Sequence, residues 1–375
     1  MDFDYAPEDL AFRDELRAWL AKNLAPGLED REWHRRLVAG RWAVPEYPAR
    51  WGGRDATLMQ QVVFHEEMAR VDAPVPRNTI ALYNIGPMLL LHGTPAQQER
   101  YLPKMVTAEE IWCQGFSEPG AGSDLAALAT RAEDHGDHWL VTGQKMWNTF
   151  GPEADFCLAL SRTNPEVAKH KGISALVVDM RAPGVTVRPL RELTGYEGFS
   201  EIFLDGVVVP KANVVGTVDG GWRVAMTTLT FERLGTMKLG IQLRKRLAGV
   251  VAIARRTGKD RDPQTRRQLA DLAIQVELMK LLTYRALTAM LRGQDPGVTL
   301  PLGKLQWSYL MQELAELALE TEGPYGGLYR GSRHEPPGDW AYHCLYARMT
   351  TIGAGTTEVQ KNIVAQRVLG LPRGF

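Results

Sequence analysis

Residues 112–124 read WCQGFSEPGAGSD, and this stretch decides the fold because the chain changes its character there. Before it apolar residues recur at helical spacing, and after it they come in short β-branched runs. Within it, Gly115, Gly120 and Gly122 lie among small side chains, where backbone amides can approach a phosphate closely. No Gly-Lys-Ser/Thr follows, so this is no Walker loop, and the full dinucleotide fingerprint is missing. On its residues alone, the stretch is either a phosphate-binding loop or an ordinary turn.

The segment upstream of this stretch has the spacing of amphipathic helices. Apolar residues such as Leu16, Trp19 and Leu20 recur at helical intervals, and proline and glycine breaks separate one run from the next. We therefore expect residues 1–111 to form an all-α N-terminal domain.

The segment downstream is typical of an antiparallel β domain, which we expect to cover residues 112–216 as a small barrel or sandwich. Residues 142–145 (TGQK) suit a hairpin turn, and residues 182–184 and 205–206 indicate further reversals of the chain. The predicted strands are 138–142, 156–161, 173–178, 185–190 and 202–210.

Helical spacing returns from Gly221, so residues 217–375 are expected to form a four-helix bundle. The clearest helix begins at Asp262-Pro263, a good N-cap and first-turn pair, and Gly293 suits its end. Two further helices are predicted at 300–322 and 340–369. The fold class is therefore α+β, with a helical domain, a β domain and a helical bundle in that order.

Composition excludes several classes of partner. The chain has 44 basic and 44 acidic residues, so no net field draws it to nucleic acid or to an anionic membrane. The three cysteines, Cys113, Cys157 and Cys344, are widely spaced, which argues against a disulfide framework and against a zinc site. The N-terminus shows no signal peptide. We expect a cytoplasmic protein with no membrane insertion.

Two hydrolytic motifs are incomplete. Ser117 is no esterase nucleophile, because Pro119 stands where the nucleophile elbow requires glycine. His65-Glu66-Glu67 begins like a zinc-protease motif, but Ala69 replaces the second histidine, so no metal site is expected. A hydrolase or a simple ligand-binding module is the least supported alternative.

Three blocks together resemble the acyl-CoA dehydrogenase family. They are residues 112–124, residues 142–149 (TGQKMWNT) and residues 352–360 (IGAGTTEVQ), the last continuing to Leu-Pro-Arg at 371–373. The similarity covers nearly the whole chain and implies the same order of helical domain, β domain and four-helix bundle. It also implies FAD as the cofactor and an acyl-CoA thioester as the substrate.

The resemblance assigns cofactor contacts residue by residue. Phe116 and Ser117 are implied beside the isoalloxazine, Gly122 and Ser123 near the pyrophosphate, and Trp147 and Thr149 on the other flank of the flavin, with Thr356 and Glu358 also touching the cofactor. A hydroxyl near N5 can donate to the reduced ring, and an indole face keeps water from the path of the hydride.

The position of the catalytic base is the sharpest question. Desaturation to the trans-2-enoyl-CoA needs a carboxylate to take the α-proton while the β-hydride goes to N5 of FAD. Many family members place this glutamate directly before the Gly-Thr of the third block, but here Ala354 precedes Gly355. The isovaleryl- and long-chain-type branch carries it before an arginine on the first bundle helix, which corresponds to Glu232 and Arg233.

Glu232 is therefore the expected base, and Arg233 the residue expected near the CoA of the substrate. The alternative is that Glu232 and Arg233 are ordinary charges on a helix face. By resemblance, the backbone amide of Ala354 still donates to the thioester carbonyl and stabilises the enolate.

Two departures concern the adenine end and the assembly. Residues 255–260 lack the expected phenylalanine, and the usual Gly-Gly loop is replaced between 323 and 339, so no cofactor contact is assigned there. These changes are similar to those of bacterial relatives that act on bulky or branched thioesters, some built from two unlike subunits. We expect a homo-oligomer, dimer or tetramer, with a hetero-oligomer as the alternative, and electron-transfer flavoprotein as the acceptor. The rival functions are an FAD-scaffolding subunit of a heteromeric dehydrogenase and an acyl-CoA oxidase.

Overall fold

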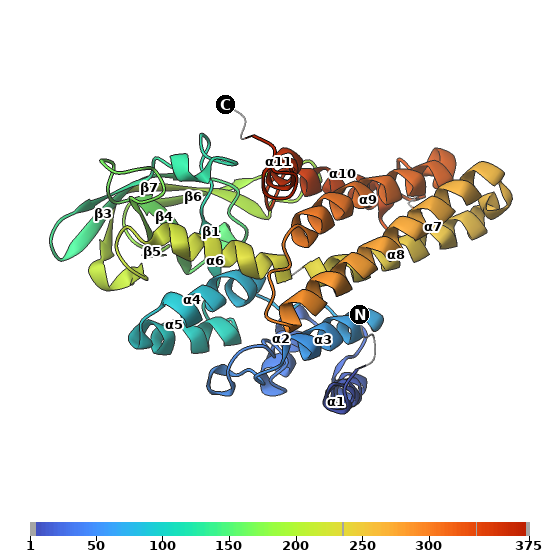
Figure 1. The fold of residues 1–375 in the computed structure, drawn as a ribbon, viewed down its shortest axis with the longest axis horizontal. Helices are drawn as coiled ribbons and strands as arrows, with labels where there is room; N and C mark the ends of the chain where they lie inside the picture. The colour runs from blue at the N-terminus through green and yellow to red at the C-terminus, as the bar shows by residue number, and fades with distance from the viewer. Residues whose placement is uncertain (1–4, 235, 335, 373–375) are drawn as a thin grey trace. The chain divides into compact units, whose positions relative to one another are not determined.

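The computed structural model describes residues 5–234, 236–334 and 336–372, and for residues 228–238 it describes no side chains. The chain divides into two compact units, each described by itself. Unit 1 comprises Met1–Leu10, Val62–Val71 and Arg233–Phe375, and unit 2 comprises Ala11–Gln61 and Asp72–Glu232. Along the chain the order is helices, strands, helices, which confirms the predicted α+β fold (Figure 1).

The N-terminal part is all-α, as the spacing predicted. Helix α5 shows why these residues are helical: Thr94 and Gln97 form a capping box, and Pro95 occupies the first turn. The rings of Trp19, Trp33 and Trp42 cluster with centroids 5.6 and 6.3 Å apart. The helices are α1 (Pro7–Asn23), α2 (Asp30–Ala39), α3 (Leu58–Arg70), α4 (Gly86–His92) and α5 (Pro95–Thr107), with a π-helical turn at Ala81–Ile85.

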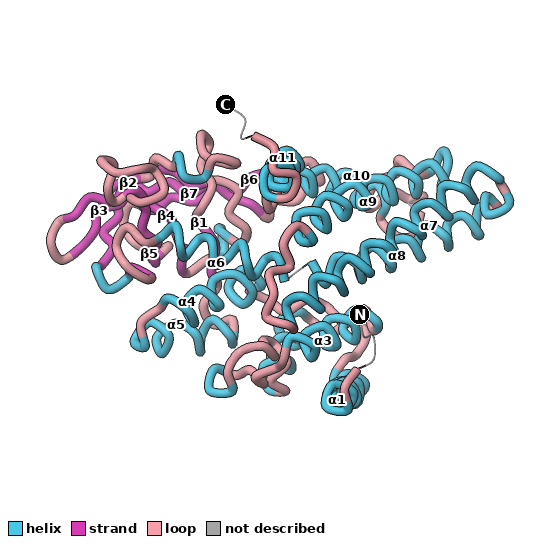
Figure 2. Tube along the Cα trace, in the orientation of Figure 1, coloured by secondary structure: helices cyan, strands magenta, loops and turns pink. Residues whose placement is uncertain are grey.

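The middle part is a single open sheet with strand order β6-β7-β3-β2-β4-β5-β8, and β1 pairs with β4 (Figure 2). No described strand joins β6 to β8, so the sheet is not the closed barrel that we had considered. The edge strand β6 contains Pro189 opposite Ser200 of β7. The strands are β1 (Trp112–Gly115), β2 (Arg131–Asp134), β3 (His138–Lys145), β4 (Phe156–Arg162), β5 (Ile173–Asp179), β6 (Val185–Leu190), β7 (Phe199–Pro210) and β8 (Val214–Val215).

The hairpin predicted at residues 142–145 is wrong, because these residues lie inside β3, where Gly143, Gln144 and Lys145 pair with β7. The register shifts between Val141 and Gly143, which identifies a bulge rather than a turn. A Cβ on Gly143 would lie 2.4 Å from Thr130 Oγ1, so glycine is needed there for close backbone approach. Residues 205–206 likewise lie inside β7, whereas the reversal predicted at 182–184 does join β5 to β6.

Helix α6 (Gly221–Leu234) follows the sheet and packs on it within unit 2. Its Val224 and Ala225 are buried in one apolar core with Ile173 and Ala175 of β5. Leu102 of α5 belongs to the same core. Strand β5 therefore shares one core with a helix that precedes the sheet and a helix that follows it.

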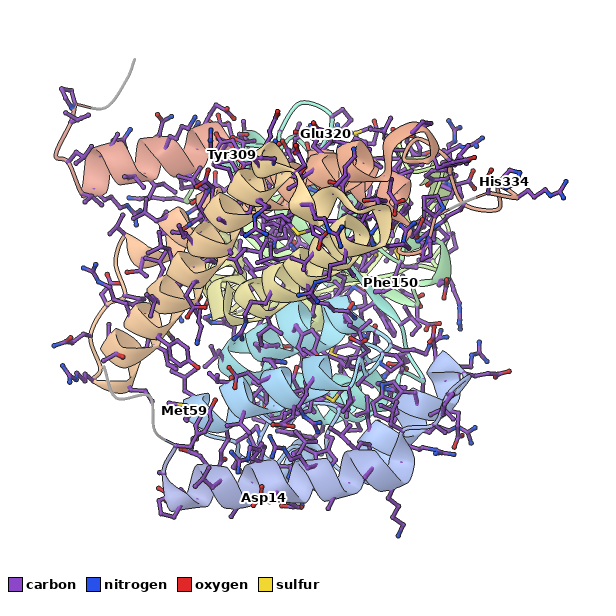
Figure 3. All side chains as sticks on the ribbon, turned by 90° about the vertical axis from the view of Figure 1, so that its right-hand side faces the viewer. Asp14, Met59, Phe150, Tyr309, Glu320 and His334 are labelled. Carbon is purple, nitrogen blue, oxygen red and sulfur yellow. The ribbon has the colours of Figure 1, made fainter. Side chains whose placement is uncertain are left out.

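Unit 1 contains the C-terminal helices. Asp262 caps α8 as predicted, accepting a hydrogen bond from Thr265 N at 2.8 Å, and Gly293 beyond its end has φ +68°. Tyr309 of α9 is 40% exposed and is labelled in Figure 3. None of the described helices is long and apolar enough to cross a membrane. The helices are α7 (Thr236–Thr257), α8 (Pro263–Leu291), α9 (Thr299–Glu322), α10 (Trp340–Ala347) and α11 (Thr357–Arg367).

The single helix predicted at 340–369 is interrupted. It is divided into α10, a 3-10 turn at Arg348–Thr351, and α11. The cause is local, because Ala354 and Gly355 adopt left-handed conformations with φ +53° and +86°.

One buried side chain joins the helical part of unit 2 to its sheet. Asn78, 2% exposed, donates from Nδ2 to the carbonyls of Met105 and Glu110 at 3.0 and 2.9 Å. Its Oδ1 accepts from the amide of Trp112 at 3.0 Å. Its φ is +59°, a region that asparagine tolerates better than most residues. Asn78 therefore fixes where β1 begins.

Replacing this side chain should destabilise unit 2. Asn78→Ala leaves two carbonyls and one amide without their partner, so we expect the free energy of unfolding to fall by about 3 kcal/mol. Urea unfolding followed by tryptophan fluorescence measures this change. The control, Asn164→Ala, removes one hydrogen bond, from the exposed amide of Glu166 at 3.0 Å, and should change it by about 1 kcal/mol or less. Equal effects of the two substitutions would contradict the role assigned to Asn78.

Candidate active site

The loop after β1 is held in a tight turn against the end of β3. The amide of Glu118 donates to the carbonyl of Ala121, and the amide of Ala121 donates back to the carbonyl of Glu118, each at 3.1 Å. The amide of Met146 donates to the carbonyl of Ser117 at 2.9 Å. Phe116 is 6% exposed. The structure therefore brings Phe116 and Ser117 beside the segment that carries Trp147.

The glycines of this loop face open space. A Cβ built on Gly120 or Gly122 meets no heavy atom within 4 Å. Neither glycine has positive φ, so the chain's own packing and conformation do not require glycine there. The observation fits a loop whose backbone is kept bare so that a phosphate group can approach it. Gly122 and Ser123, predicted near a pyrophosphate, lie in this open part.

Trp147 is the most unusual side chain of the region. It is 55% exposed and adopts φ +63°, a conformation that costs energy for a bulky residue and is frequent at functional sites. Its ring makes an edge contact with Phe199, with centroids 6.0 Å apart. An exposed indole held in this way fits a partner ring that is supplied by a cofactor.

Asn148, the residue after Trp147, stabilises this backbone conformation. Asn148, 1% exposed, donates from Nδ2 to the carbonyl of Gln114 at 2.7 Å, and its backbone pairs with Ser200 in both directions at 3.1 Å. Its Oδ1 is buried and has no hydrogen-bond partner among the described residues. Thr149 follows, half-buried. Trp147 and Thr149 thus extend from a rigid segment next to Phe116 and Ser117.

A buried ion pair lies behind the loop. Lys145 Nζ donates to Glu118 Oε1 at 2.7 Å. Burial lowers the pKa of Lys145, and the carboxylate of Glu118 opposes this shift. Burial alone would raise the pKa of Glu118, but the Lys145 ammonium and the hydrogen bonds from Thr130 and Ala129 outweigh it and lower that pKa. Each group therefore favours the charged form of the other.

The third sequence block lies in unit 1. Thr356 caps α11, its hydroxyl accepting from the amide of Val359 at 3.2 Å, and Glu358 lies in the first turn. The carbonyl of Ala354 accepts from Gln360 Nε2 at 3.4 Å. Buried Lys304 donates to the carbonyl of Thr350 at 2.7 Å, and burial lowers its pKa to about 8 against the opposing charge of Glu358. The cofactor contacts predicted for Thr356 and Glu358 remain predictions.

The side chains of Glu232 and Arg233 lie outside the described residues, so their predicted roles also remain predictions. The backbone of both residues is part of α6.

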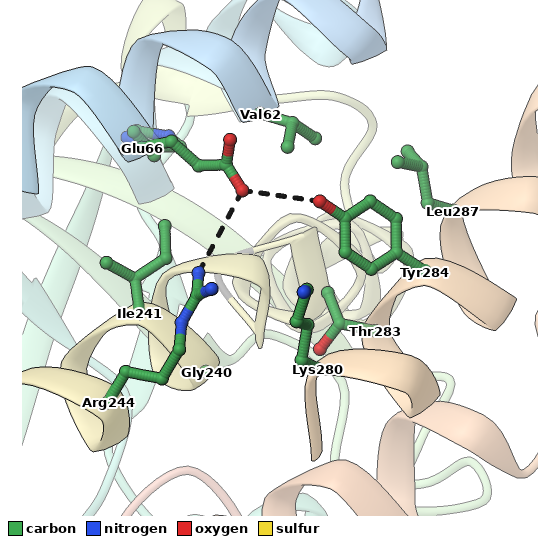
Figure 4. A pocket seen from close by; sticks show the side chains of 10 residues that line it. Val62, Glu66, Gly240, Ile241, Arg244, Lys280, Thr283, Tyr284 and Leu287 are labelled. Carbon is green, nitrogen blue, oxygen red and sulfur yellow. Dashed lines mark hydrogen bonds and ion pairs between the residues drawn. The ribbon is translucent and has the colours of Figure 1, made fainter. Parts of the chain in front are cut away.

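The incomplete zinc motif on α3 has a structural role within unit 1. Glu66 accepts hydrogen bonds from the hydroxyls of Tyr5 at 2.5 Å and Tyr284 at 3.4 Å, and it lies 4.0 Å from Arg244 of α7 (Figure 4). Burial raises the pKa of Tyr284. The parts of the chain that the structure describes contain no group of three or more histidine, cysteine or acidic residues arranged to hold a metal.

The order of helical, β and helical parts, with a bare glycine loop beside an exposed tryptophan, is the arrangement that the resemblance of the sequence implies. Family models match along almost the whole length: "Acyl-CoA dehydrogenase, N-terminal domain" at residues 6–109, "middle domain" at 113–207 and "C-terminal domain" at 219–369. The chain belongs to the acyl-CoA dehydrogenase family. It is thus an FAD-dependent enzyme of the acyl-CoA dehydrogenase class.

Two relatives match end to end. The acyl-CoA dehydrogenase IpdE1 of Mycobacterium tuberculosis is 39% identical over 384 residues, which cover 96% of this chain and 97% of that protein. IpdE1 of Mycolicibacterium smegmatis is 37% identical over 391 residues, with the same coverage of 96% and 97%.

Solved structures show the same fold. A "Tcur3481-Tcur3483 steroid ACAD" is similar with a TM-score of 0.89 and 29% identity, covering 100% of both chains. The ChsE4-ChsE5 complex from Mycobacterium tuberculosis is similar with a TM-score of 0.81 and 28% identity, also covering 100% of both chains.

The open space at Gly122 gives a direct test of the cofactor loop. Gly122→Ala should leave the thermal midpoint of the FAD-free protein unchanged, because the methyl group meets nothing in the chain. If the pyrophosphate approaches this backbone, the same methyl group should raise the dissociation constant for FAD by about tenfold or more. Titration of the FAD-free protein with FAD, followed by flavin fluorescence, measures it.

The matched control is Gly120→Ala, which adds the same methyl group to the same loop at a glycine with no assigned contact. It should bind FAD as the unmodified protein does. Unchanged FAD affinity in Gly122→Ala would remove the pyrophosphate from this part of the loop.

Proposed function

We propose that the protein desaturates an acyl-CoA thioester between its α and β carbons, with Glu232 as the base that takes the α-proton. The observation that carries this proposal is the position of the glutamate in the sequence. The carboxylate that many relatives carry before Gly355 is absent at Ala354, while Glu232 directly precedes Arg233 at the end of α6. Of the side chains at these two positions, only the carboxylate of Glu232 can accept a proton.

The proton and the hydride that leave the substrate each have an acceptor. The α C–H bond gives its proton to Glu232, a hydride leaves the β carbon, and a C=C double bond forms between the two carbons. FAD, when bound, supplies the hydride acceptor at N5.

The other residues of the chain orient the substrate and exclude water. The left-handed conformation of Ala354, with φ +53°, sets the direction of its amide, which we assign to the thioester carbonyl as a donor to the developing enolate. Phe116 is assigned beside the flavin ring, and the exposed ring of Trp147 keeps water from the path of the hydride. The hydroxyls of Ser117 and Thr149 are assigned as donors to the reduced flavin ring. Arg233 is assigned to the CoA.

The acyl group is proposed to be bulky or branched. The support comes from the similar solved structures, one of which is named a steroid acyl-CoA dehydrogenase, and from the altered segments at 255–260 and 323–339. We assign electron-transfer flavoprotein as the electron acceptor and the cytoplasm as the compartment, the latter because the three cysteines are unpaired.

A second candidate is supported by the same neighbours. Two of the similar structures carry two-component names, Tcur3481-Tcur3483 and ChsE4-ChsE5. The chain would then be one subunit of a heteromeric enzyme, contributing part of an FAD site. A purified chain that is colourless and inert alone, and becomes yellow and active with an unlike subunit, would favour this candidate over a homo-oligomer. Release of hydrogen peroxide during turnover would instead favour an oxidase.

The test of the base is Glu232→Gln. The amide preserves the shape of the side chain but cannot accept the proton, so FAD and acyl-CoA should bind while the rate of flavin bleaching falls by about 10²-fold or more. Anaerobic mixing of the yellow protein with a panel of straight-chain, branched and ring-bearing acyl-CoAs measures the rate and the substrate class together.

The control is Glu99→Gln on the exposed face of α5, which makes the same chemical change far from any assigned role. It should bleach at the unmodified rate. Normal bleaching in Glu232→Gln would place the base on another residue.

A further inference from the structure

Lys145 is the last residue of β3, and its whole side chain is buried at 0% exposure. A lysine is rarely enclosed so completely, because burying an ammonium is costly unless it is paired and hydrogen-bonded. Its stem runs against the backbone of Gly115, where a Cβ would lie 3.4 Å from Lys145 Cγ. The ammonium is thus directed under the loop that follows β1.

The ammonium joins two points of that loop. Nζ donates to the carbonyl of Phe116 at 3.3 Å and to the carboxylate of Glu118 at 2.7 Å. These two groups flank Ser117, whose own carbonyl accepts from the amide of Met146. Three consecutive loop residues are therefore bonded to two consecutive residues at the end of β3.

Glu118 extends the connection to a third segment. Its two carboxylate oxygens accept hydrogen bonds from the amides of Ala129 at 2.6 Å and Thr130 at 3.0 Å, just before β2. The carboxylate is 7% exposed. The whole loop from Phe116 to Thr130 is thus closed at its base by one buried ion pair, while its glycines stay bare.

We propose that Lys145, through Glu118 and the Phe116 carbonyl, is the positioning residue of the cofactor loop, holding Phe116 and Ser117 in the orientation that receives the flavin. This inference rests on the proposed flavin contacts of those two residues. A charged donor suits the task because it bonds two acceptors at once in a dry site, where an apolar side chain would fill the space without fixing direction.

A second ion pair on the same loop provides the comparison. Lys169 Nζ donates to both carboxylate oxygens of Asp124 at 2.9 and 2.7 Å. The side chains of Lys169 and Asp124 are 51% and 59% exposed. Exposed pairs of this kind contribute little. The two lysines therefore bond the same loop with opposite degrees of burial.

The experiment compares Lys145→Met, the double variant Lys145→Met with Glu118→Gln, and the control Lys169→Met. Each full-length protein is stripped of FAD, and its thermal midpoint and its dissociation constant for FAD are measured. Lys145→Met should lower the midpoint and raise the dissociation constant by about tenfold or more, because a buried carboxylate and a carbonyl lose their donor. Lys169→Met should match the unmodified protein in both measurements.

The double variant separates positioning from mere stability. It removes the unpaired buried charge, so its thermal midpoint should rise above that of Lys145→Met, although glutamine can accept from only one of the Ala129 and Thr130 amides. The Phe116 carbonyl still lacks its donor, so FAD binding should stay weakened by about tenfold. Recovery of FAD affinity together with the midpoint would overturn the proposal, as would unchanged affinity in Lys145→Met.

The outcome is independent of the catalytic proposal. FAD titration of the unmodified chain requires no substrate and no base. Failure of that chain, with FAD bound, to bleach with any acyl-CoA would contradict dehydrogenation by this chain alone and leave the comparison of the lysine variants intact.

Discussion

The contact on which the rest of the site depends is the one between the buried ammonium of Lys145 and the turn after β1. A loop that receives a cofactor must leave its backbone bare, so it cannot be fixed by side chains on its open face. The chain fixes it from beneath, through Glu118 and the Phe116 carbonyl. The strained backbone of Trp147, two residues after Lys145, is stabilised in the same region by Asn148 and Ser200. The buried bonds of Lys145 thus fix the loop on one side, and the glycines leave its other side open.

Much of the fold was readable from the sequence because its signals are local. The runs at 156–161, 173–178 and 185–190 became β4, β5 and β6 within one residue of their predicted bounds. They are continuous apolar or alternating segments, and their neighbours in the sheet do not change that pattern. The start of α8 at Asp262-Pro263 was equally predictable, since a cap acts within one turn.

The parts that the sequence did not reveal depend on distant neighbours. Strands β1 and β2 have four residues each, too few to show a period. The Thr142-Gly143 pair has the composition of a turn, but the glycine is there to admit Thr130. In the site, the resemblance predicts flavin contacts for Phe116, Ser117 and Trp147. The hydrogen bond from the Met146 amide to the Ser117 carbonyl brings their two segments side by side in unit 2, and the flavin contacts stay predictions. No local sequence pattern predicts that Lys145 is buried, because its partner Glu118 lies 27 residues away.

The open edge of the sheet at β6 has a consequence for the behaviour of the protein in concentrated solution. The backbone N–H and C=O groups on the free side of an edge strand can pair with a strand of another molecule, and repeated pairing of this kind leads to fibres. Pro189 of β6 has no N–H group that could donate to an added strand. Arg188, two positions before the end of β6, places a cation over the ring of Phe203. The β part can therefore stay unclosed without becoming a template for self-association.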